Sequence, residues 1–208
     1  MFMQLFKNKD FLPLLASRFL SAVNEGFIRI VFLFFVTYNL TKPNPVFMIM
    51  AVLLYALSFC CGTIYIGQIA DRFSKGKVLK VVRLAEIGIM ALALGSIFLD
   101  SRVLLTSILI LMGMVNACLR VLDSALVMEV TTPKKYNVAN TLMKVSTVFA
   151  AAFACLLLTS ILKFDVAYFV VCFTGLVASI ISYFITLKVP QNEPADKTCS
   201  LFQNPFNV

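Results

Sequence analysis

Long apolar stretches separated by short polar connections run along almost the whole chain. A hydrocarbon core about 30 Å thick needs roughly 20 apolar residues in a helix to cross it. In lipid the backbone must satisfy its own hydrogen bonds, so spans of this kind are helices. We predict an all-α integral membrane protein with six transmembrane helices within residues 1–187, over Phe11 to Leu40, Val46 to Ile66, Val78 to Leu99, Val103 to Met128, Thr141 to Leu162 and Val166 to Leu187.

Composition supports this prediction, because 61% of the residues are hydrophobic. Residues 188–208 differ: they hold Pro190, Pro194 and Pro205 among scattered polar residues, which is typical of a cytoplasmic linker-like tail. A secretory signal peptide is the alternative for the first apolar run. That run is too long, and Arg18 interrupts it without a small-residue cleavage site, so we interpret it as a retained span.

Basic residues distinguish the two sides of the predicted membrane domain. One side holds three of them, Lys42, Arg102 and Lys163, and the other holds eleven: Lys7, Lys9, Arg72, Lys75, Lys77, Lys80, Arg83, Lys134, Lys135, Lys188 and Lys197. Cytoplasmic loops carry the excess of Lys and Arg, so we expect both termini of this integral membrane protein to lie in the cytoplasm. The net charge of +8 then reflects loops facing anionic headgroups, and we expect no nucleic-acid partner.

Several kinds of chemistry are disfavoured. The chain has no histidine, which removes His-based catalysis and most transition-metal sites. Its six cysteines show no metal-ligand spacing. The sequence contains no nucleophile elbow and no phosphate-cradling glycine loop. We therefore expect no enzyme activity, no cofactor and no metal.

Charged residues inside a span are the best functional candidates. Glu25 and Arg29 lie four positions apart, on one helical face, with Asn24 and Gly26 beside Glu25. If the helix begins near Phe11, Glu25 lies about 21 Å along it. A charge at that depth costs about 3 kcal/mol, so such residues usually face a cavity or a partner. We predict a substrate site at Asn24, Glu25 and Arg29; the alternative is an ion pair with a packing role.

Other charged positions favour structural roles. Arg120 and Asp123 are three positions apart near the predicted cytoplasmic end of the fourth span, where long side chains reach the interface. We interpret them as an interfacial pair. Glu86 and Lys144 lie two turns or less inside their helices and are also compatible with structural roles.

The connection from Gly67 to Lys77 is unusually rich in charge. It carries Asp71, Arg72, Lys75 and Lys77 between two apolar spans, which predicts a tight, surface-held turn. That arrangement is typical of transporters.

These motifs resemble a known family. Phe19 to Arg29 resembles the signature F-L-x-A-x-N-D-N-x-x-K of lysophospholipid transporters, which belong to the major facilitator superfamily. Gly67 to Lys77 resembles the superfamily loop G-x-x-x-D-[RK]-x-G-[RK]-[RK]. The stretches from Val82 to Glu86 and from Met112 to Lys144 are also similar to this family, so the resemblance covers nearly all of residues 10 to 187.

The chain departs from the family pattern at polar positions. Glu25, Gly26 and Arg29 stand where the signature has Asp, Asn and Lys. The fourth-span pattern P-x-K-Y is replaced by a stretch that contains Asp123, and Lys144 stands where an acid is common. These changes affect the positions that would handle the substrate.

The resemblance implies a fold and an activity. Transporters of this superfamily pair two six-helix halves around a central cavity, and the six spans correspond to the first half. A second half, from another chain or from a homodimer, is therefore expected. The complete transporter would move lysophospholipids from the outer to the inner leaflet by alternating access, for reacylation by an acyltransferase or an acyl-acyl carrier protein synthetase. Gly67, Asp71, Arg72, Lys75 and Lys77 would form a gating loop that latches the halves.

The same resemblance implies roles for two charged side chains. Arg29 would meet the substrate phosphate and Glu25 an amine headgroup. Two other classes of protein stay open: a truncated or split-gene remnant without transport activity, and the membrane anchor of a phospholipid-reacylating enzyme system.

Overall fold

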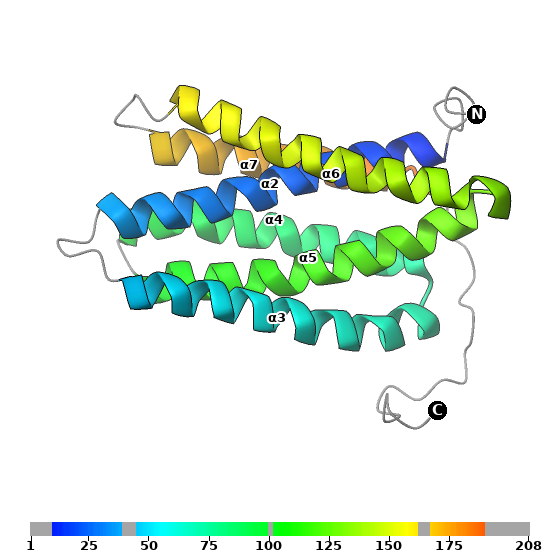
Figure 1. Ribbon diagram of the computed structural model, residues 1–208, viewed down its shortest axis with the longest axis horizontal. Helices are drawn as coiled ribbons and strands as arrows, with labels where there is room; N and C mark the ends of the chain where they lie inside the picture. Colours follow the sequence, from blue (N-terminus) through cyan, green and yellow to red (C-terminus); the bar gives the residue numbers. More distant parts are fainter. Residues whose placement is uncertain (1–9, 39–44, 100–101, 162–166, 190–208) are drawn as a thin grey trace.

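The computed structural model describes residues 10–38, 45–99, 102–161 and 167–189. These residues form an all-α bundle, as predicted, and Figure 1 shows its long helices lying roughly side by side. Its six helices are α2 (Phe11–Tyr38), α3 (Pro45–Arg72), α4 (Lys75–Leu99), α5 (Arg102–Val130), α6 (Pro133–Ile161) and α7 (Ala167–Thr186).

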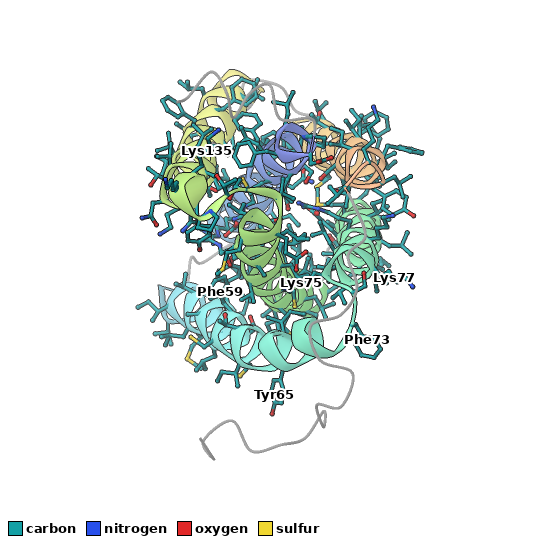
Figure 2. All side chains as sticks on the ribbon, turned by 90° about the vertical axis from the view of Figure 1, so that its right-hand side faces the viewer. Phe59, Tyr65, Phe73, Lys75, Lys77 and Lys135 are labelled. Atoms are coloured by element: carbon teal, nitrogen blue, oxygen red, sulfur yellow. The ribbon has the colours of Figure 1, made fainter. Side chains whose placement is uncertain are left out.

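Successive helices run in opposite directions, so the start of α2 and the end of α7 lie at the same end of the bundle (Figure 1). The connections from α3 to α4 and from α5 to α6 lie at this end too. Helices α2, α6 and α7 pack together on one side of the bundle, and α3 lies on the opposite side against α5 (Figures 1 and 2). Helix α5 therefore joins the two sides, because it contacts α2, α3, α4 and α6.

The buried apolar side chains form two groups, one toward each end of the bundle. Phe11, Leu79 and Leu126 belong to the group at the end where α2 begins. Phe27 and Ile108 belong to the other group. Polar residues of α2 from Ser17 to Glu25 are buried along the stretch that joins the two groups. A polar layer thus lies inside an otherwise apolar bundle.

Within the described residues, four helices contain a stretch long and apolar enough to cross a membrane. These stretches are Ile49–Gly67, Val103–Val130, Pro133–Leu157 and Phe169–Thr186. Large apolar side chains such as Leu57, Val81 and Phe184 point outward. An apolar exterior suits lipid rather than water, so the prediction of membrane-spanning helices is supported for these four helices of the six.

The charged connection is shorter than predicted. Helix α3 continues to Arg72 and α4 begins at Lys75, so only Phe73 and Ser74 lie between them. The carbonyl oxygen of Ser74 accepts the backbone N–H groups of Lys77 and Val78, at 2.9 and 3.1 Å. The backbone carbonyl of Ser74 thus makes the first hydrogen bonds of α4, and the Ser74 hydroxyl has no hydrogen-bond partner. The predicted turn over Gly67 to Lys77 is therefore wrong in extent.

The fifth predicted span begins too late. Helix α6 starts at Pro133, eight residues before Thr141, because the Thr132 carbonyl accepts the N–H groups of Lys135 and Tyr136. Proline is well suited to a first helical position, since its missing N–H would be unpaired there. Hydropathy alone placed the start where the polar residues end.

Close packing of α3 on α5 depends on glycine. A Cβ atom at Gly62 would lie 2.9 Å from the Ala117 Cβ and 3.1 Å from the Met114 carbonyl oxygen. We expect Gly62→Ala to lower the free energy of unfolding by about 1–3 kcal/mol, since overpacking against a backbone is poorly relieved. SDS-titration unfolding in mixed micelles measures this. Gly88→Ala is the control, because a Cβ there meets nothing within 4 Å. Equal stability of Gly62→Ala and the parent would contradict the prediction.

Candidate functional site

Glu25 lies at the centre of a buried ionic cluster in the middle of α2. Its side chain is 5% exposed and forms an ion pair with Arg29 one turn later. The Tyr55 hydroxyl of α3 donates to Glu25 Oε1 at 2.8 Å and accepts from Arg29 Nη2 at 2.6 Å. Arg120 Nη2 of α5 lies 3.5 Å from both carboxylate oxygens. We call these four residues, Glu25, Arg29, Tyr55 and Arg120, the Glu25 cluster.

Aromatic rings of α3 support both guanidinium groups. Arg29 lies over the Tyr55 ring with 4.6 Å to its centroid, and Arg120 lies over the Phe59 ring at 5.4 Å. Cation–π contacts of this kind stabilise a charge that is partly removed from water. The Arg29 and Arg120 side chains are nevertheless 47% and 44% exposed. The cluster therefore has a buried acid and two accessible cations.

A second network lies among α2, α4 and α7. Glu86 accepts hydrogen bonds from Ser21 Oγ at 2.7 Å, Asn24 Nδ2 at 3.3 Å and Arg83 Nη1 at 2.9 Å. Asn24 also donates to Ser179 Oγ at 2.6 Å. The side chains of Arg83 and Glu86 are fully buried. We call these five residues, Ser21, Asn24, Arg83, Glu86 and Ser179, the Glu86 network.

Adjacent residues of α2 therefore belong to different groups. Glu25 and Arg29 meet as predicted, whereas Asn24 contacts Glu86 and Ser179. Neighbouring positions on a helix do not face each other, which explains the separation. The structure thus brings together two of the three residues predicted to bind substrate. Glu86 is buried and accepts three hydrogen bonds, which is compatible with a structural role.

The predicted pairing of Arg120 with Asp123 is wrong. Asp123 Oδ2 lies 3.7 Å from Arg18 Nε of α2, while Arg120 contacts Glu25. Asp123 is also 3% exposed, so it is a core residue and not an interfacial one. Three positions along a helix allow a contact but do not require it, because side chains from a second helix compete for the same partner.

Two cavities lie near the Glu25 cluster. A polar cavity of about 320 Å³ is lined by Arg18, Arg120, Asp123, Asn140 and Lys144, among others, from α2, α5 and α6. An apolar cavity of about 250 Å³ is lined by Arg29, Phe32, Val52, Tyr55, Ala56 and Leu109, from α2, α3 and α5. Arg120 and Arg29 each line one cavity, and Glu25 contacts both arginines. The cluster thus connects a polar space to an apolar one.

The residues predicted to gate are divided between two helix ends. Gly67, Asp71 and Arg72 belong to the end of α3, and the side chains of Asp71 and Arg72 lie outside the described residues. Lys75 and Lys77 begin α4 and lie at the end of the bundle that Figure 2 faces. Lys75 Nζ pairs with Glu129 Oε1 of α5 at 2.6 Å. This pair links the start of α4 to the end of α5.

Sequence reasoning missed two members of the Glu25 cluster. Tyr55 is one of several hydroxyl-bearing residues in an apolar span, and Arg120 was assigned to the wrong partner. The available signal was the arginine itself, which needs a counter-charge when it lies within a membrane span. Among the described residues, no group of three His, Cys, Asp or Glu side chains could hold a metal ion.

No protein-family model matches the chain, and no curated protein matches it. Its class therefore follows from its own structure: an all-α protein with four candidate membrane-spanning helices and with buried ionic groups on α2 and α4.

Proposed function

We propose that this chain is one half of a membrane transporter for lysophospholipids, with all six helices crossing a bacterial cytoplasmic membrane. The observation that carries this proposal is the position of the Glu25 cluster between a polar cavity and an apolar cavity. A lysophospholipid has a phosphate headgroup and one acyl chain, so it needs both kinds of surface. The cationic groups of the cluster suit the phosphate, and the apolar cavity suits the chain.

Exposed arginines in mid-helix support the need for a second half. Arg29 and Arg120 are nearly half exposed, and Arg29 lies one turn beyond Glu25, which is in the middle of α2. A charged group in contact with hydrocarbon at this depth costs about 3 kcal/mol or more. This face is better covered by further helices that enclose an aqueous cavity, as at the repeat interface of secondary transporters. A second chain or a second copy would supply those helices.

In this proposal, rocking of the two halves would carry the headgroup from one side of the membrane to the other. The helix ends around Gly67, Asp71, Arg72, Lys75 and Lys77 would latch the halves on the cytoplasmic side. Lipid delivered to the inner leaflet would serve an acyltransferase or an acyl-acyl carrier protein synthetase as substrate. Both termini would lie in the cytoplasm.

Lysophospholipid uptake tests the proposal directly. We expect proteoliposomes containing the chain to move labelled lysophosphatidylethanolamine inward faster than protein-free vesicles do, and to leave a two-chain phospholipid unmoved. The control is an equal amount of heat-unfolded protein in the same vesicles. No acceleration by folded, inserted chain would contradict transport by this chain, and would favour a remnant or a membrane anchor.

A further inference from the structure

The polar cavity contains more positive than negative charge. Arg18, Arg120 and Lys144 line it, and Asp123 is the acid among its lining residues. Three cations and one acid leave an excess of two positive charges. Partly enclosed by protein, these charges attract an anion more strongly than they would in bulk solvent. The charge balance thus favours an anionic ligand.

Two buried side chains of this cavity lack hydrogen-bond partners. Arg18 and Asp123 are each 3% exposed, and their closest approach is 3.7 Å, between Nε and Oδ2. Arg18 Nη1 and both Asp123 carboxylate oxygens have no hydrogen-bond partner. Leaving buried polar atoms unpaired is costly, so such groups require an explanation. A ligand that accepts from Arg18 and donates to Asp123 would satisfy both.

The polar cavity opens to the molecular surface and extends into the bundle. Lys144 and Arg120 are exposed, so the cavity meets the molecular surface on their side. Asp123 lies seven residues before the end of α5 at Val130, about 10 Å along the helix. Arg120 lies three residues deeper along α5 than Asp123, so a ligand in the cavity can contact both the buried pair of Arg18 and Asp123 and the exposed Arg120 and Lys144.

We propose that this cavity binds a phosphate ester whose neighbouring group donates hydrogen bonds. Arg18, Arg120 and Lys144 donate to the phosphate oxygens, and Asp123 accepts from an adjacent hydroxyl or ammonium group. The inference deepens the proposed function, because it assigns the headgroup to this cavity. It also assigns the acid that contacts the headgroup to Asp123 instead of Glu25. Glu25 already contacts Arg29, Arg120 and Tyr55.

Calorimetry on the full chain in detergent tests the site with three probes: inorganic phosphate, sn-glycerol 3-phosphate and sn-glycero-3-phosphoethanolamine. We expect both esters to bind more tightly than inorganic phosphate. Lys144→Ala should weaken ester binding roughly tenfold or more, because it removes a charge-assisted hydrogen bond. Lys144 is exposed, so its loss leaves the fold intact. Lys134→Ala is the matched control, since Lys134 is an exposed lysine of the same helix outside the cavity.

Asp123→Asn tests recognition of the donating group of the ligand separately from recognition of its phosphate. It should reduce the advantage of the esters over inorganic phosphate, because the carboxylate no longer accepts from the neighbouring group. Equal binding of esters by Lys144→Ala and the parent would overturn the site. Equal affinity for inorganic phosphate and the esters would overturn the ester assignment and indicate a site for free phosphate.

The calorimetric result is independent of transport. Lipid uptake without Lys144-dependent ester binding would overturn this site and leave the proposed function standing. Ester binding that depends on Lys144 without lipid uptake would support the site and contradict the proposed function.

Discussion

Replacing Glu86 by alanine is expected to lower the free energy of unfolding by about 3–5 kcal/mol, because it leaves the fully buried Arg83 without its counter-charge. Ser21 and Asn24 lose their common acceptor at the same time. Arg83→Ala should cost a similar amount, since it leaves the Glu86 carboxylate buried without the guanidinium. SDS-titration unfolding in mixed micelles measures both.

The double variant Arg83→Met with Glu86→Leu distinguishes the effect of an unpaired buried charge from the effect of lost side-chain volume. It removes both charges and keeps most of the buried volume, so it should be more stable than either single variant. Lys134→Ala is the control, because an exposed side chain outside these networks changes stability by about 0.5 kcal/mol or less. A double variant less stable than both single variants would contradict the charge argument.

Glu25→Gln should lower the rate of lysophospholipid uptake about tenfold or more in a chain that transports. Glutamine keeps the size of the side chain and an acceptor for the Tyr55 hydroxyl, but it removes the charge that Arg29 and Arg120 share. A hydrogen bond to a charged group contributes about 1.5–3 kcal/mol, and 1.4 kcal/mol corresponds to a factor of ten. Initial rates in proteoliposomes measure the loss.

Ester binding, unlike uptake, should not be weakened by Glu25→Gln. With its counter-charge removed, Arg120 is freer to meet a phosphate in the polar cavity, so affinity for sn-glycerol 3-phosphate should be equal to or tighter than that of the parent. Tyr55→Phe provides an intermediate case, because it removes the two hydrogen bonds of the hydroxyl and keeps both ion pairs. Uptake at the parental rate by folded Glu25→Gln would show that the cluster has a packing role only.

Helix positions could be predicted well from the sequence because lipid imposes a strong rule on composition and length. The start of α2 at Phe11 and the end of α4 at Leu99 agree with the apolar pattern. The predicted helix ends that were wrong are those where a helix extends past its apolar stretch. Arg72 and Pro133 lie in helices because local hydrogen bonds and capping continue where hydropathy stops.

The pairing of charges was much less predictable. Glu25 and Arg29 were found because one helix brings positions four apart onto the same face. Arg120 was paired with Asp123 by the same rule, and the rule failed because α2 offered each of them a better partner. Asn24 was grouped with Glu25 by adjacency, although a helix directs adjacent side chains to different neighbours.

By itself the sequence determined that the chain is all-α, that its helices are long and apolar, and that ionisable residues lie inside them, because these properties depend only on composition and local periodicity. The tertiary structure alone decided which charges meet. The packing of α5 against α2 and α3 placed Arg120 beside Glu25 and Phe59, and the same packing set Asp123 beside Arg18. Contacts between helices depend on how each helix is rotated and packed, and local periodicity does not encode that.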